Sequence, residues 1–120
     1  MTNFNPVLRF LAVSDVHYKD EHSKEREYMA KALKTSYEIA HNHPTYKKLD
    51  AVVVAGDFAT SGTQIQMDAF KKTLDDGLEE GTQPILLISS HEFRGEGGMQ
   101  GGFDRFTKTF SQNLDQHNVI

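Results

Sequence analysis

The feature that most constrains the fold is a set of three short apolar runs, each followed by an amphipathic stretch of helical length. The runs cover residues 7–13, 51–55 and 85–88, and Pro84 opens the third. The second and third runs lack the alternation of a half-exposed strand. Continuous apolar runs of this kind predict strands buried on both faces of a parallel sheet.

The spacing of apolar residues between and after these runs predicts helices. One helix is expected over 23–41, with Ser23 as its N-cap and Ile39 on its apolar stripe, and a second over 63–78. The last stretch repeats the spacing, with an apolar stripe of Phe103, Phe106, Phe110 and Leu114. The order βαβαβα, with crossovers of this length, predicts a layered α/β fold with a mainly parallel sheet and right-handed connections.

The composition narrows the classes of protein to which this chain could belong. The chain has 120 residues, enough for a single domain, and it has no cysteine, which excludes disulfides, thiol nucleophiles and thiolate metal sites. Its net charge of −4 does not indicate nucleic acid as a partner. The apolar runs are too short to cross a bilayer, and no signal peptide is recognisable, so we expect a soluble, cytoplasmic protein without a membrane partner.

Carboxylates and imidazoles follow each predicted strand. Asp15 and His17 come after the first run, Asp57 after the second, and His91 with Glu92 after the third. Because ligands bind beyond the carboxyl ends of the strands in α/β sheets, we expect these side chains to lie together. Such ligands, without thiols, suit Mn²⁺, Fe or Zn²⁺.

The three motifs are Asp15-Val16-His17, Gly56-Asp57 and Ser89-Ser90-His91-Glu92. In order and position they resemble those of the calcineurin-like metallophosphoesterases: Asp-x-His, Gly-Asp and Gly-Asn-His-Asp/Glu, each after a strand. The resemblance runs from about Leu8 to Gly102. It implies the N-terminal half of that family's α/β sandwich, and a metal-dependent phosphoric ester hydrolase.

The resemblance also implies roles. Asp15 and His17 would ligate one metal ion, Asp57 would bridge two ions, and a metal-bound hydroxide would attack phosphorus. Position 90 would ligate the second ion, weakly, because Ser90 replaces the family's Asn. His91 would be catalytic, as a proton donor or a stabiliser of phosphoryl charge. The two ions would be Mn, Fe, Zn, Ni or Co, and the substrate a small phosphate ester or a nucleotide.

One segment is rich in glycine. Residues 94–102 hold five of the nine glycines and predict a flexible loop, in which Arg94 is a candidate contact for a substrate phosphate. Nothing after His91 matches the family's later histidine motifs, and His117 lacks their Gly-His context. We therefore expect residues 1–120 to form a single, partial domain with weak activity or none by itself.

Two alternatives accompany this hypothesis. In the first, the chain is a non-catalytic, truncated or degenerate module that self-associates or pairs with another chain through an exposed sheet edge. In the second, it is a nucleotide-binding Rossmann-type domain, which is disfavoured because no Gly-x-Gly-x-x-Gly follows the first strand.

Overall fold

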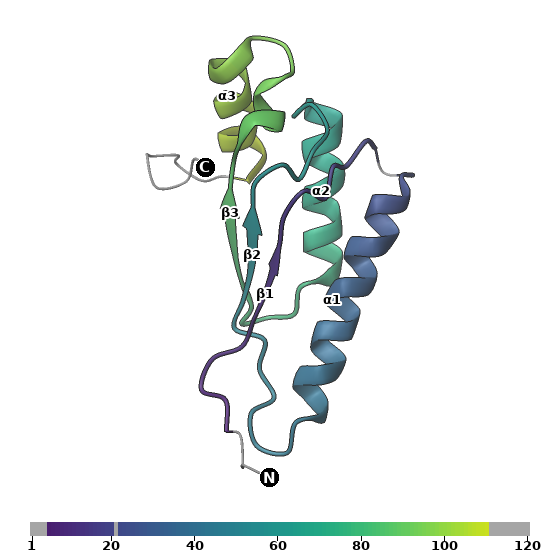
Figure 1. Ribbon diagram of the computed structural model, residues 1–120, viewed down its shortest axis with the longest axis vertical. Coiled ribbons are helices and arrows are strands. Elements are labelled where there is room, and N and C mark those ends of the chain that lie inside the picture. The colour runs from purple at the N-terminus through teal and green to yellow at the C-terminus, as the bar shows by residue number, and fades with distance from the viewer. Residues whose placement is uncertain (1–4, 21, 111–120) are drawn as a thin grey trace.

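The computed structural model describes residues 5–20 and 22–110, and it has the predicted α/β order. Three strands alternate with three helices, and a short 3₁₀ helix follows the last strand (Figure 1). No helix of the described segments is long and apolar enough to cross a membrane. The elements are β1 (Phe10–Val13), α1 (Lys24–Asn42), β2 (Ala51–Ala55), α2 (Gln64–Gly77), β3 (Gln83–Leu87), η1 (Ser90–Phe93) and α3 (Gly98–Phe110).

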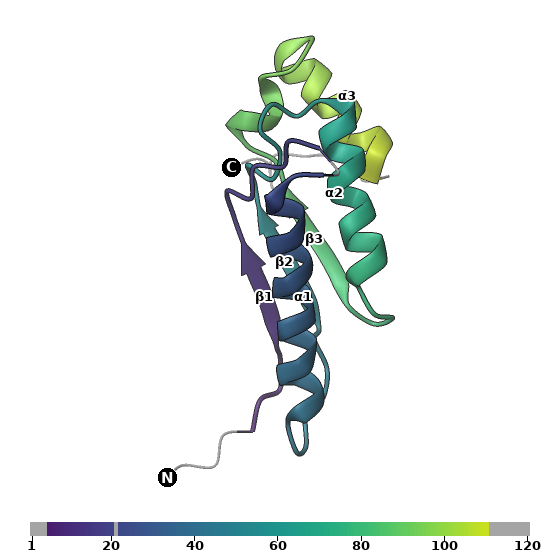
Figure 2. The ribbon, with the colours of Figure 1, turned by 90° about the vertical axis from the view of Figure 1, so that its right-hand side faces the viewer.

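The sheet is parallel, and its strands lie in sequence order, β1-β2-β3. Val52 of β2 pairs with Leu11 on one side and with Pro84 on the other. Right-handed crossovers that advance in one direction place their helices on the same face of a sheet. Accordingly, α1 and α2 lie side by side on one face, while α3 lies beyond the carboxyl end of β3 (Figures 1 and 2).

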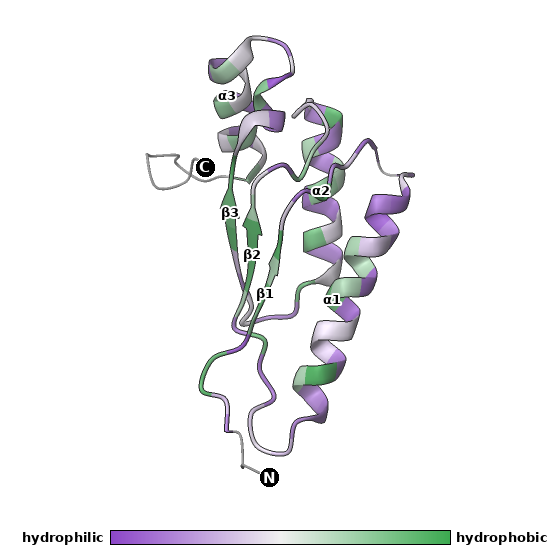
Figure 3. Ribbon diagram, viewed as in Figure 1, coloured by the Kyte–Doolittle hydropathy of each residue, from purple (hydrophilic) through white to green (hydrophobic). Residues whose placement is uncertain are grey.

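The core fills the space between the sheet and these two helices. Val52, Val54 and Leu86 point into it from the strands, and Leu33 and Phe70 meet them from α1 and α2, all nearly fully buried. Each such side chain contributes about 1.5–3 kcal/mol through burial. The colouring of Figure 3 matches this arrangement, with apolar strands and helices that are polar on one side.

The opposite face of the sheet is uncovered by the described residues, so the prediction of strands buried on both faces was wrong. Phe10 and Ile85 are 56% and 39% exposed, and Leu8, just before β1, is 62% exposed. A shallow hollow of about 300 Å³ runs across this face. The apolar runs therefore predicted where the strands lie, but they did not indicate how many faces of the sheet the chain covers. The hollow is lined by Leu8, Phe10, Asp50, Ala51, Val53, Gln83 and Ile85.

The boundaries of α1 and α2 agree with the predictions to within one residue, with two local differences in α1. Ser23 holds the N-cap position of α1, but its hydroxyl donates to Asp20 O instead of capping the helix. Ile39, which was predicted to lie on the apolar stripe of α1, is 62% exposed, whereas Tyr37 lies on that stripe and is buried. The Tyr37 hydroxyl donates to Thr82 Oγ1 at 2.6 Å, which lets the polar end of this ring be buried.

The glycine-rich segment is not a loop throughout, because α3 begins at Gly98 and so includes the second half of residues 94–102. A Cβ on Gly101 would lie 2.1 Å from Glu96 O, and one on Gly102 would lie 2.6 Å from Glu92 O. These two glycines therefore allow α3 to pack closely on the preceding turn. The predicted stripe is confirmed through Phe110, which contacts Phe58, whereas Leu114 and His117 lie outside the described residues.

Candidate metal centre

The backbone is strained at three residues of the predicted site. Asp15, His17 and Asp57 have φ values of 55°, 56° and 52°, and no other non-glycine residue among the described ones has a positive φ. This left-handed conformation is unfavourable for residues with a Cβ, although Asp and His tolerate it better than most. Such strain costs on the order of 1–3 kcal/mol per residue and clusters at functional sites.

Backbone hydrogen bonds hold the first two strand-end loops together. His17 N donates to Asp57 O at 3.1 Å, and Tyr18 N donates to Phe58 O at 2.7 Å. Tyr18 also forms an isolated parallel bridge with Ala59. The pairing of β1 with β2 thus continues past the strands, and it fixes His17 beside Asp57.

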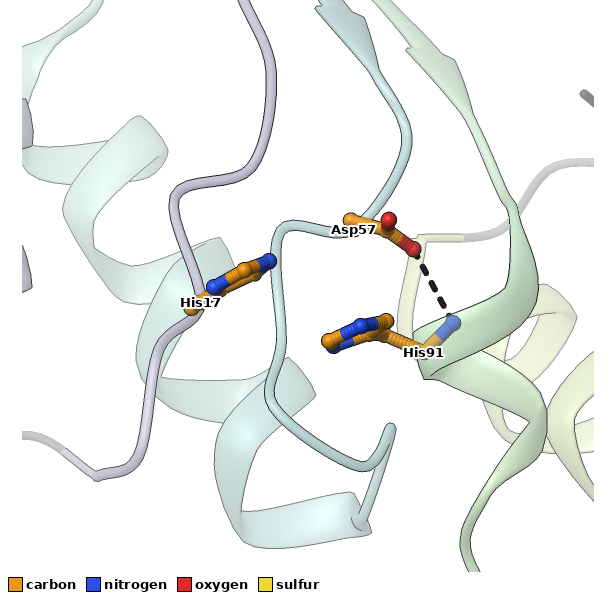
Figure 4. A group of neighbouring side chains, drawn as sticks. All are labelled: His17, Asp57 and His91. Atoms are coloured by element: carbon orange, nitrogen blue, oxygen red, sulfur yellow. Dashed lines mark hydrogen bonds between the residues drawn. The ribbon is translucent and has the colours of Figure 1, made fainter.

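The third loop is joined to Asp57 through its side chain. Asp57 Oδ1 accepts a hydrogen bond from the Ser89 hydroxyl at 2.6 Å and another from His91 N at 2.9 Å (Figure 4). Burial acts to raise the pKa of the Asp57 carboxyl, but these hydrogen bonds and the imidazoles of His91 and His17 hold the pKa below its ordinary value. Asp57 is therefore an ionised carboxylate at neutral pH.

Glu92 lies behind this site and ties its loops together. It is fully buried, and its carboxyl group accepts hydrogen bonds from Asp57 N at 2.7 Å, Ser89 N at 3.2 Å and Ala59 N at 3.4 Å. Burial raises the pKa of Glu92 to about 7, although the backbone donors act in the opposite direction. Glu92 was expected among the strand-end ligands, but in the structure it supports the loops from behind. The signal was present as a capping box, in which Ser89 and Glu92 bond to each other's backbone.

Three side-chain atoms converge in front of Glu92. His17, Asp57 and His91 each offer one ligand atom, and these atoms all lie within 4.8 Å of one another (Figure 4). The two imidazole rings are stacked, with their centroids 4.5 Å apart and an interplanar angle of 5°. His17 Nε2 and His91 Nδ1 are buried and have no hydrogen-bond partner among the described residues.

This donor set fits a divalent metal ion. A buried nitrogen without a partner is costly, and a metal ion is one of the few groups that satisfies two imidazole nitrogens and a carboxylate together. A span of 4.8 Å is slightly more than two metal–nitrogen bonds of about 2.1 Å, but the two rings are stacked, so at least one ring must turn before both nitrogens point at the same ion. The arrangement is therefore chemically competent for metal binding.

The other predicted site residues lie outside this group of three. Asp15 Oδ1 is 3.5 Å from His17 Nε2, which is an ion-pair distance rather than a hydrogen bond, and its side chain is 64% exposed. Ser90 is exposed at the start of η1, and its neighbour Ser89 is the serine that contacts Asp57. Arg94 is also exposed, at the end of η1, where its backbone N–H donates to His91 O.

A hollow of about 570 Å³ opens beside the site, between the end of β1 and the start of α1. Asp15, His17, Glu25 and Tyr28 line part of it. Another hollow, of about 440 Å³, lies between α1 and α2 and includes none of the candidate ligands. The first hollow therefore has room for a small molecule next to His17.

Comparison with known proteins added no family to this picture. No protein-family model matches the chain, and no curated protein is detectably similar to it. The likeness to the calcineurin-like metallophosphoesterases therefore remains a prediction from three sequence motifs. The cluster of His17, Asp57 and His91 is a separate observation from the structure.

Proposed function

We propose that this chain is a metal-dependent phosphoric ester hydrolase, or the part of one that carries its metal site. The observation that carries the proposal is the convergence of His17, Asp57 and His91 at the carboxyl edge of a parallel sheet. The backbone strain at His17 and Asp57 supports it independently, because a fold keeps such strain where a side chain must point to one place.

The metal would supply the reactive chemistry. A bound divalent ion lowers the pKa of water and polarises a phosphoryl oxygen. The protein's own contribution is to hold Asp57 ionised, through Ser89 and His91, and to keep both imidazoles close to it. The hollow beside His17 and Asp15 gives a small phosphate ester or a nucleotide room to approach. The cytoplasmic location expected from the sequence belongs to the same proposal.

The test is hydrolysis of p-nitrophenyl phosphate and of bis(p-nitrophenyl) phosphate, with Mn²⁺ or with a chelator. We expect Mn²⁺-dependent turnover that Asp57→Asn lowers by about 100-fold or more, since Asp57 is the carboxylate in the cluster of His17, Asp57 and His91. Asp104→Asn is the matched control, because Asp104 is exposed on α3. Equal rates for the two variants, or rates unaffected by the chelator, contradict the proposal.

A second function is favoured by the uncovered sheet face. Phe10 and Ile85 leave an apolar surface that suits a non-catalytic module pairing with itself or with another chain. Light scattering over a wide concentration range tests self-association, and Phe10→Ser should weaken it. A wild-type chain that stays monomeric and stable at all concentrations counts against self-association.

A further inference from the structure

We propose that Ser89 is a positioning residue of this site, whose hydroxyl holds the carboxylate of Asp57 in the orientation in which it takes a divalent cation. The inference rests on the proposed function for the metal, and it is the same whether Asp57 takes one ion or two. The family resemblance does not imply this role, because the family's motif has glycine at this position and glycine has no side chain.

The hydrogen bond between the two side chains is short and shielded from water. Ser89 Oγ lies 2.6 Å from Asp57 Oδ1, and Ser89 is only 8% exposed. An ionised carboxylate can only accept, so the serine hydroxyl is the donor. Hydrogen bonds from a hydroxyl to a carboxylate are roughly twice as strong as those between neutral groups. Ser89 therefore restrains the Asp57 side chain more firmly than an ordinary contact does.

The same hydrogen bond sets the rotation of the Asp57 carboxylate. Oδ1 accepts from the Ser89 hydroxyl and from His91 N, whereas Oδ2 accepts no hydrogen bond from the described residues. Because the two oxygens turn together about the Cβ–Cγ bond, a restraint on Oδ1 also restrains Oδ2. The donors occupy lone pairs of Oδ1, so Oδ2 has the greater free capacity for a cation.

Glu92 fixes the backbone of Ser89 relative to that of Asp57. Glu92 Oε1 accepts from both Asp57 N, at 2.7 Å, and Ser89 N, at 3.2 Å. Ser89 has φ −143° and ψ −164°, an extended conformation that any residue adopts. One buried carboxyl group thus joins the donor residue to the acceptor residue. The bond between Ser89 and Asp57 is therefore formed before an ion arrives, as a well-supported metal site requires.

Mn²⁺ binding by the chain, measured by calorimetry, is the main test. We expect Ser89→Ala to weaken binding about 10-fold or more, because groups that orient a metal ligand contribute on this scale. Ser36→Ala is the matched control, since the Ser36 hydroxyl donates to Ala32 O within α1 and its loss should leave binding unchanged. A Ser89→Ala variant that binds Mn²⁺ as tightly as the wild type overturns the inference.

Two readouts separate positioning from a general effect on folding. Ser89→Thr keeps the hydroxyl, so we expect it to restore most of the affinity, and a folded threonine variant that binds as weakly as Ser89→Ala overturns the inference. The visible spectrum of the Co²⁺ complex should change in Ser89→Ala, because the Asp57 oxygens are no longer held, and an unchanged spectrum overturns the inference as well. Urea unfolding with a chelator shows which variants are folded.

A measurement on the wild type needs no variant and stays decisive where a substitution unfolds the chain. In NMR spectra of the chain with Zn²⁺, the hydroxyl proton of Ser89 should be resolved and protected from exchange with water. The physical reason is that this proton remains bonded to Asp57 Oδ1 in the complex. Rapid exchange of the proton in the Zn²⁺ complex overturns the inference.

These outcomes are distinguishable from a failure of the proposed function. Metal binding that depends on the Ser89 hydroxyl, without hydrolysis of either phosphate ester, removes the proposed function alone. Mn²⁺-dependent hydrolysis, with metal binding that is insensitive to Ser89→Ala, removes this inference alone. A chain that binds no divalent ion removes both.

Discussion

Replacing Glu92 by glutamine should change how the stability of the chain depends on pH. Folded Glu92 has a pKa of about 7, against 4.5 for the unfolded chain, because the side chain is fully buried. Between these two values the folded state binds a proton that the unfolded state has released. The contribution of Glu92 to stability is therefore complete below about pH 4.5 and declines as the pH rises to about 7.

The magnitude follows from the difference between the two pKa values. At about 1.4 kcal/mol per pKa unit, a rise from 4.5 to about 7 corresponds to a loss of roughly 3 kcal/mol in the free energy of unfolding. Glutamine keeps an oxygen that can accept from Asp57 N and Ser89 N, as Glu92 Oε1 does, but it cannot ionise. The glutamine NH2 would face Ala59 N, so the hydrogen bond to Glu92 Oε2 is lost and Glu92→Gln should be somewhat less stable than the wild type near pH 5. Between pH 5 and pH 8 the variant should gain up to about 3 kcal/mol relative to the wild type.

The assay is urea unfolding at several pH values between 5 and 8, in the presence of a chelator so that metal binding does not contribute. Comparing the two proteins removes the titration of all other groups, including the histidines. Parallel stability curves for the wild type and Glu92→Gln would refute the reasoning. A stability of Glu92→Ala equal to that of Glu92→Gln would refute it as well, because alanine leaves three buried backbone N–H groups without an acceptor.

Three further predictions concern stability. Gly62→Ala should lower the free energy of unfolding by about 3 kcal/mol or more, because the φ of Gly62 is +71° and the new Cβ would lie 2.2 Å from Glu92 O. Gly81→Ala should lower it by only about 1–2 kcal/mol, because Gly81 has a φ of +94° but open space around it. Urea unfolding compares the two variants. Tyr18→Phe should cost about 1 kcal/mol in the same assay, because it removes a buried hydrogen bond to Thr73 Oγ1. Mn²⁺ at 100 times its dissociation constant should stabilise the wild type by about 2.7 kcal/mol, seen as a higher melting temperature.

Much of the fold was predictable because its elements depend on local patterns. The run Ala51–Ala55 became β2 with the predicted ends, and Thr63 caps α2 by accepting from Gln66 N. What the pattern did not reveal is how many faces of the sheet are covered. That depends on the direction of the crossovers, and the exposed Phe10 is the result.

The candidate site was predictable to the level of loops but not of atoms. Strand ends in a parallel sheet meet at one edge, which correctly placed His17, Asp57 and His91 together. The expectation of Ser90 as a weak ligand followed the family's spacing, and it did not anticipate that Ser89, at the N-cap of η1, donates a hydrogen bond to Asp57. No sequence pattern indicates that the His17 and His91 rings stack, or that His17 Nε2 and His91 Nδ1 lack a hydrogen-bond partner among the described residues.

A crystal structure of the chain grown with Mn²⁺ or Zn²⁺, with data collected at the absorption edge of the metal, tests the central claim most directly. We expect anomalous density beside His17, Asp57 and His91. A structure with no peak near these residues would contradict the metal centre itself.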